Sequence, residues 1–184
     1  MILEEIGFDD IHPLSFRPIL DAWFRQKGEA AYPPVSAIDP FIVPSLAPNV
    51  ILLEVTGDTF AYRVIGDEIR QVVGRDLRNL TIRDFLGDTA YARLIEEQFR
   101  RSVEDRVPLY SVHHFRRQRD QLILATRRII MPYAKDGRAS RLLAFQTIDD
   151  FPPGQIALPT LDLMSRTVFR VAPPHRPGGS GGPP

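Results

Sequence analysis

Hydrophobic positions near the N-terminus predict one amphipathic helix and then an irregular connector. In the segment SFRPILDAWFRQKGE, Ser15 is a suitable N-cap and Gly28 a suitable stop. Apolar residues recur between them with a helical period, on a stripe made of Phe16, Ile19, Leu20, Trp23 and Phe24. Five prolines in residues 32–48 prevent a regular element there, so we expect a connector with a turn or two of helix at most.

The middle of the chain changes from a strand period to a helical period. Residues 50–55 and 59–65 read as the two strands of a hairpin. Residues 67–73 then predict a short helix that ends at Gly74. Residues 88–105 form the longest helical pattern, with an apolar stripe of Tyr91, Leu94, Ile95, Phe99 and Val103.

After Pro108 the strand period returns and predicts a meander. Its three strands are residues 109–117, 121–133 and 140–148, and Asp136-Gly137 is a hairpin turn. The order of elements therefore predicts an α+β domain with five antiparallel strands. The last strand is apolar on both of its faces, so both faces of the sheet need cover, which the N-terminal helix can supply.

The C-terminal extension, residues 151–184, carries weaker patterns. Residues 160–170 are consistent with a short helical stretch. The composition of the end, PPHRPGGSGGPP, predicts disorder at least from about residue 172, because such a segment has almost nothing to bury.

Composition excludes several classes of function. The chain has no cysteine, which excludes thiol catalysis, cysteine-bound zinc and iron–sulfur clusters, and which suits a reducing cytoplasm. The segment MILEEIGFDD is no signal peptide, and no apolar run is long enough for a membrane span. We therefore expect a cytoplasmic protein without a membrane partner.

Charge is unevenly spread although the formal net charge is zero. Residues 1–60 contain three basic and nine acidic side chains, whereas residues 100–128 contain eight basic and three acidic ones. Such a dipole can orient a second subunit or an acidic protein partner. Nucleic-acid binding is not expected without an overall basic excess. We expect the basic side chains near Arg127 and Arg128 to be solvated.

The element order over residues 46–149 resembles a PAS domain, the sensory module of bacterial signalling proteins. The chain also contains, in this order, the motifs DAWFRQKG, DPFIVPSLAP, YRVIG and GRDLRNLTIRDFL. With these motifs, residues 15–150 resemble more closely a family of stand-alone PAS proteins, mostly alphaproteobacterial. The resemblance implies a five-stranded antiparallel sheet with helices on one face and a cavity between them. The N-terminal helix would pack on the sheet or form a homodimer interface.

The resemblance divides the chain into residues 1–45, 46–150 and 151–184: an N-terminal helix with its connector, the PAS-like domain and the extension. The candidates for lining the ligand pocket are Tyr62, Arg63, Phe85, Phe99, His113, Phe115 and Phe145. The N-terminal apolar stripe named above supplies the dimer or helix-packing candidates.

Two of these candidates raise chemical questions. If Arg63 faces the helical layer, it needs a carboxylate partner, for which Asp76 and Asp84 are available, or an anionic ligand. His113 and His114 are adjacent on a strand, so they point to opposite faces and cannot share one metal ion. Gly66 and Gly74 flank a helix, and their spacing fits no phosphate-binding motif.

No cofactor or metal is predicted. The proximal histidine of haem-binding PAS proteins usually comes from a helix, and residues 88–105 contain no histidine. Cysteinyl-flavin photochemistry is excluded because the chain has no cysteine. No arrangement of nucleophile, base and orienting group is recognisable, so we expect no enzymatic activity.

The sequence thus favours a cytoplasmic sensory or regulatory protein that binds a small ligand, a signalling partner or both. One alternative is a ligand-free scaffold for dimerisation or localisation, with a core filled by Phe60, Phe85, Phe99, Phe115 and Phe145. The other is a small cone-shaped α+β enzyme or lipid-binding protein, which would need an inward Asp or Glu with a raised pKa.

Overall fold

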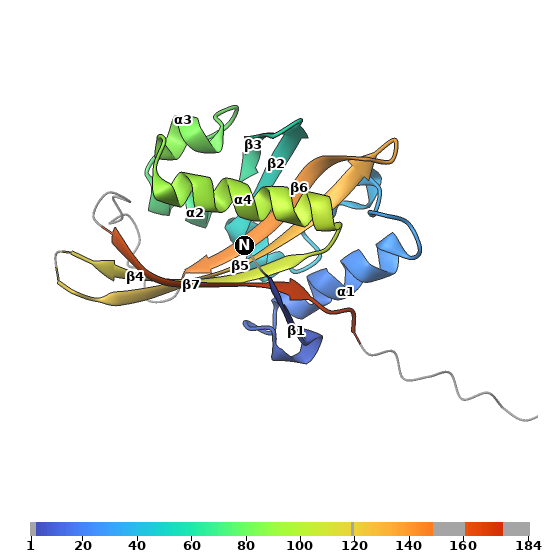
Figure 1. Ribbon diagram of the computed structural model, residues 1–184, viewed down its shortest axis with the longest axis horizontal. Helices are drawn as coiled ribbons and strands as arrows, with labels where there is room; N and C mark the ends of the chain where they lie inside the picture. The colour runs from blue at the N-terminus through green and yellow to red at the C-terminus, as the bar shows by residue number, and fades with distance from the viewer. Residues whose placement is uncertain (1–2, 119, 149–160, 175–184) are drawn as a thin grey trace, which may run out of the picture.

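The fold is built on one large sheet (Figure 1). The computed structural model describes residues 3–118, 120–148 and 161–174. Within them the sheet has seven strands in the order β1-β7-β4-β5-β6-β2-β3. Neighbouring strands are antiparallel except β1 and β7, which are parallel. The bounds are β1 Glu4–Ile6, β2 Val50–Thr56, β3 Thr59–Ile65, β4 Leu109–Arg117, β5 Ile123–Lys135, β6 Arg138–Ile148 and β7 Leu161–Val171.

The five predicted strands lie where the sequence placed them, but the prediction of a purely antiparallel, five-stranded sheet was wrong. Strand β7 was also mispredicted, since residues 160–170 had suggested a helical stretch. Its residues pair with β4 from Leu109↔Arg170 to Arg117↔Leu161. This pairing satisfies the backbone groups of β4 that would otherwise form an open sheet edge, and that demand is not visible in the local pattern of β7.

The chain just after β7 is held to the N-terminus. The Ala172 N–H donates to the Ile6 carbonyl at 3.0 Å, next to the β1–β7 pairing. The disorder expected from about residue 172 onwards stays a prediction. Most of the segment to which it applied, residues 175–184, lies outside the described residues.

Three helices cover one face of the sheet: α2 Asp67–Val73, α3 Ile82–Leu86 and α4 Ala90–Asp105. Side-chain caps fix two of their starts. The Thr89 hydroxyl accepts from the Ala92 N–H at 3.0 Å, and Thr81 and Asp84 form a capping box at α3. In Figure 1, α4 runs across the sheet, and α2 and α3 lie near its N-terminal part.

Helix α1, Phe16–Lys27, covers the opposite face. It ends at Gly28, whose N–H donates to the Phe24 carbonyl at 3.2 Å. The proline-rich connector contains the short 3-10 turns η2 Val35–Ala37 and η3 Pro44–Asn49. No helix in the described part of the chain is both long and apolar enough to cross a membrane.

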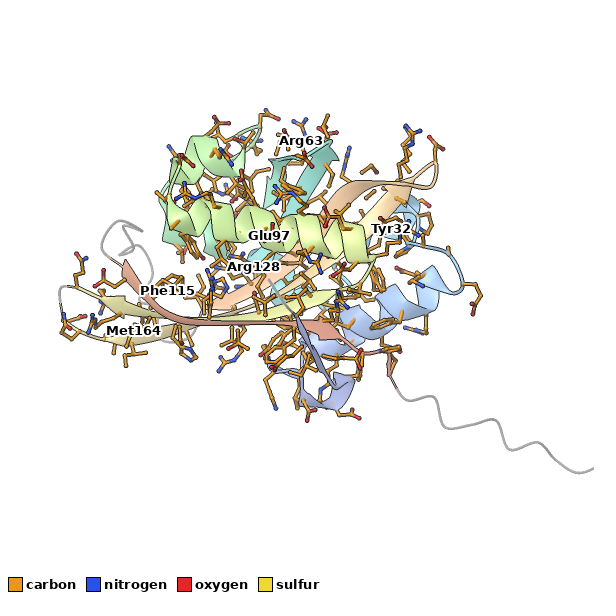
Figure 2. The ribbon with its side chains drawn as sticks, in the orientation of Figure 1. Tyr32, Arg63, Glu97, Phe115, Arg128 and Met164 are labelled. Atoms are coloured by element: carbon orange, nitrogen blue, oxygen red, sulfur yellow. The ribbon has the colours of Figure 1, made fainter. Side chains whose placement is uncertain are left out.

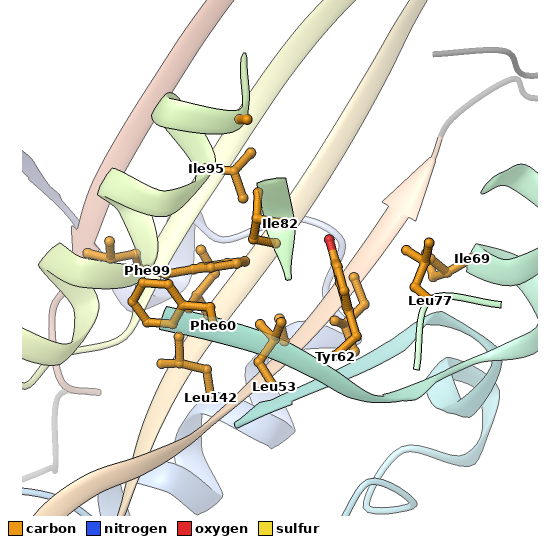
Figure 3. Close-up of a cluster of buried hydrophobic side chains, with 14 of the residues drawn as sticks. Leu53, Phe60, Tyr62, Ile69, Leu77, Ile82, Ile95, Phe99 and Leu142 are labelled. Atoms are coloured by element: carbon orange, nitrogen blue, oxygen red, sulfur yellow. The ribbon is translucent and has the colours of Figure 1, made fainter. Parts of the chain in front are cut away.

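Two hydrophobic clusters result, one on each side of the sheet. Strand β6 contributes to both: Leu142 and Ala144 pack under α4, whereas Leu143 and Phe145 pack against α1. The structure thus covers both faces, as the apolar pattern of this strand requires. The cluster beneath α2–α4 is shown in Figure 3, where Phe60 and Phe99 pack edge to face with ring centroids 5.4 Å apart.

Candidate functional site

A cavity of about 70 Å³ lies between the sheet and the layer formed by α2, α3 and α4. A single buried water needs about 10–15 Å³ on the same scale, so there is room for more than one water or for a small molecule. The walls are mainly aliphatic and aromatic, with the residues Ile51, Ile69, Val72, Val73, Leu77, Phe85, Leu86, Ile95 and Phe99. Polar atoms come from Tyr62, Tyr91, Arg128 and Gln146.

Arg128 is the charged residue of this cavity wall. Ser111, Arg128 and Gln146 lie opposite one another on β4, β5 and β6, so they share the face of the sheet that the helices cover. Arg128 Nε donates to Gln146 Oε1 at 2.8 Å, and Nη2 donates to the same oxygen. The residue is 8% exposed and lies between α4 and the sheet (Figure 2).

Two tyrosines complete the polar lining. Burial raises the pKa of the Tyr62 hydroxyl, and the positive charge of Arg128 only partly opposes this effect. Burial also raises the pKa of Tyr91, and the positive charge of Arg128 again only partly opposes this effect. Both hydroxyls therefore keep their protons at neutral pH and can act as hydrogen-bond donors.

His113 lies in the same layer but outside the cavity wall. It is 1% exposed, and its ring centroid lies 5.9 Å from that of Tyr91 and 6.1 Å from that of Phe115. Its Nε2 is 3.0 Å from the Gln98 amide nitrogen. With that nitrogen as the donor, the imidazole is neutral and Nε2 is already engaged.

Burial lowers the pKa of His113 to about 3, with the charges of Arg128, Arg166 and His114 acting in the same direction. We predict that the free energy of unfolding falls as the pH drops from about 6.5 towards about 3. In this range His113 is protonated in the unfolded chain and stays neutral in the folded chain. The slope should be up to about 1.4 kcal/mol per pH unit. Urea unfolding between about pH 7.5 and about pH 5 measures it.

The substitution His113→Gln should flatten this slope, because it removes the titrating ring and keeps a polar end. The matched control is His114→Gln on the opposite face, where the His114 Nδ1 is 3.0 Å from the Ser165 hydroxyl. It should leave the slope unchanged. An equal slope in the wild type and in the His113 variant would contradict the prediction.

Three of the predicted pocket residues, Tyr62, Phe85 and Phe99, line the cavity. Phe115 is buried on the same face, where its ring packs 5.6 Å from that of Tyr91, without lining the cavity. Phe145 lies in the cluster under α1, on the other side of the sheet.

Arg63 does not face the helical layer. It is exposed and donates to Glu54 Oε2 at 2.9 Å and to Asn79 Oδ1, so neither Asp76 nor Asp84 is its partner. The inward arginine of the cavity is instead Arg128, which the sequence had placed among solvated charges. The doublet Arg127-Arg128 inside an apolar strand carried the necessary signal, because adjacent strand residues point to opposite faces.

The helix-packing candidates lie in the core of a single chain. Phe16, Ile19, Leu20 and Trp23 are 0–2% exposed, and Phe24 is partly buried beside them. In this arrangement the four fully buried side chains are not available to a second subunit. A homodimer stays a prediction, and it would have to use other surface.

A cavity between an antiparallel meander and a set of short helices with one long helix is the architecture of a PAS-type sensory domain. A family model described as PAS domain matches residues 11–146, so the chain belongs to the PAS domain family. Family membership supports a sensory or regulatory role.

One similar solved structure is that of a Vibrio cholera VqmA–ligand–DNA complex, with a TM-score of 0.43 and 14% sequence identity. The match covers 57% of this chain and 49% of that one, so the chain spans about half the length of that protein. No curated protein matches. Within the described residues, no three His, Asp or Glu side chains gather in a way that could hold a metal ion.

Proposed function

We propose that this protein is a non-enzymatic cytoplasmic PAS protein that senses a small ligand in the cavity between its sheet and helices α2–α4. The observation that carries the proposal is the cavity itself, which combines apolar walls with buried hydrogen-bonding groups. Such a mixture is typical of small-molecule sites, where the apolar walls supply affinity and the few polar groups fix orientation.

Signalling would follow from a shift between two packings of the helical layer. Helices α2 and α3 have seven and five residues, and their cavity-lining side chains Val73, Phe85 and Leu86 are only partly buried. A ligand that fills the space beneath them stabilises the packing in which they close on the sheet. A protein partner that contacts α2 or α3 would then distinguish the bound from the free form.

Two alternatives from the sequence fit the structure less well. A ligand-free scaffold was expected to have a core filled by aromatic rings, yet a cavity lies among Tyr62, Phe85 and Phe99. A cone-shaped enzyme would need an inward carboxylate with a raised pKa. Among the described residues, the shifted carboxylates Glu54, Asp76 and Asp84 have lowered pKa values, because hydrogen bonds from Arg63, Arg78 and Thr81, respectively, stabilise their charged forms.

Native mass spectrometry of the full chain, purified from its source cells, tests the proposal. We expect the wild type to retain a small molecule that Val73→Phe, which fills part of the cavity, excludes. The control Val112→Phe places the same bulk on the opposite face and should retain the molecule. Circular dichroism verifies that each variant folds. Wild-type protein that carries no small molecule and binds none from a cell extract would favour the ligand-free scaffold.

A further inference from the structure

The guanidinium of Arg128 is only partly satisfied. Its Nε and Nη2 both donate to the single acceptor Gln146 Oε1, whereas the buried Nη1 has no hydrogen-bond partner in the structure. Within the described ranges, no Asp or Glu forms an ion pair with it. Arg117, which is also buried, differs because it has such a partner in Asp120, at 2.6 Å.

A buried guanidinium without an anionic partner lowers the stability of the folded protein. Taking a cation out of water without an opposite charge costs several kcal/mol even after relaxation, and an unpaired donor adds to that cost. The Arg63–Glu54 salt bridge, in contrast, is formed near the surface, where water already solvates the charges. An unpaired cation in the wall of a cavity is therefore best explained by an anion that enters the cavity.

We propose that Arg128 anchors a small organic carboxylic acid, whose carboxylate pairs with the guanidinium at the cavity wall. This inference rests on the proposed ligand-sensing function and specifies its ligand class. The hydroxyls of Tyr62 and Tyr91, which line the same cavity, are the further donors available to the second carboxylate oxygen.

Charge and space favour a monocarboxylate over a phosphate. One guanidinium neutralises one negative charge, and a phosphate needs more donors than this wall offers. The rest of the lining is mainly apolar, with Ile69, Val73 and Phe85 among its residues, and this suits a short hydrocarbon body. The volume of about 70 Å³ limits that body to a few carbon atoms unless α2 and α3 yield.

Thermal unfolding and calorimetric titration of the full chain test this inference. The probes are propionate and butyrate, with propionamide and butyramide as neutral isosteres at matched ionic strength. We expect the acids, and not the amides, to raise the melting temperature of the wild type. Arg128→Gln should weaken acid binding by about 10- to 100-fold, the loss expected for a charge-assisted hydrogen bond.

Arg127→Gln is the matched control, because it changes the neighbouring charge on the same strand. The charge of Arg127 affects the pKa of Tyr110, which belongs to the cluster under α1 on the other face of the sheet. This variant should therefore bind the acids as the wild type does. Arg128→Met gives a second readout: without ligand its melting temperature should equal or exceed that of the wild type, since the unpaired buried charge is gone. A purely structural Arg128 would lower it.

Three outcomes would overturn the inference. The acids could leave the wild type unchanged, inorganic phosphate could stabilise it as strongly as they do, or Arg128→Gln could bind them as tightly as the wild type does. Retention of a neutral cellular molecule by both wild type and Arg128→Gln in native mass spectrometry would also reject the anion, yet leave the proposed sensory function standing. Absence of any bound molecule, together with no response to the acids, would reject both.

Discussion

Replacing Gly66 by alanine is expected to destabilise the fold by about 3 kcal/mol or more, the upper range for overpacking a tight site. An added Cβ would lie 2.2 Å from the Pro48 carbonyl oxygen and 2.4 Å from its carbon. These are backbone atoms at the end of the connector, so they cannot rotate away. The Gly66 N–H also donates to the Val50 carbonyl at 2.8 Å, which holds the two segments together.

Chemical denaturation of the purified variant measures this loss, with a second glycine as the control. Gly74 ends α2 with φ 75°, and no atom lies within 4 Å of its added Cβ. Gly74→Ala should therefore cost about 1 kcal/mol, the penalty of a left-handed backbone alone. Equal losses at the two positions would mean that the connector yields, and that close packing does not explain the glycine at position 66.

Trp23→Ala should destabilise the protein by about 3–5 kcal/mol, the range for deleting a large buried aromatic side chain. Trp23 is 0% exposed in the cluster between α1 and the sheet. Its indole Nε1 donates to the Pro132 carbonyl on β5 at 2.9 Å. The substitution leaves a cavity and removes the donor of this hydrogen bond. Guanidinium unfolding followed by far-UV circular dichroism measures the change.

Two further variants separate packing from hydrogen bonding. Trp23→Phe keeps most of the apolar volume and loses the indole donor, so it should cost about 1–3 kcal/mol for the unpaired carbonyl. Phe24→Ala removes a neighbouring aromatic ring that is only partly buried, so its effect should be smaller than that of Trp23→Ala. If Phe24→Ala lowered the stability as much as Trp23→Ala does, burial of Trp23 would not be what holds α1 on the sheet.

Local patterns were sufficient for the elements that satisfy themselves nearby in the chain. The hairpin of β2 and β3 and the meander of β4, β5 and β6 pair neighbours in sequence, so strand period and turn residues predicted them. Strands β1 and β7 pair across more than 160 residues, from Glu4↔Phe169 onwards. No local pattern reports such a distant partner, and the weak periodicity of residues 160–170 was read as helical.

The cavity shows the same division. Tyr62, Phe85 and Phe99 were among the pocket candidates of the PAS resemblance, and all three line the cavity. The arginine was misassigned, because both Arg63 and Arg128 occur in strands. Glu54 on the neighbouring strand accepts a hydrogen bond from Arg63 and keeps that side chain at the surface. Arg128 finds no such carboxylate among the described residues and faces the cavity beside Gln146.

By itself, the sequence determined the class of fold, the five central strands and the need to cover both sheet faces, because these follow from periodicity and turn chemistry within short stretches. The tertiary structure decided the strand count, the position of α1 under the sheet and which arginine faces the cavity. Those outcomes depend on backbone hydrogen bonds and ion pairs between groups that are far apart in the chain. Only folding brings such groups together.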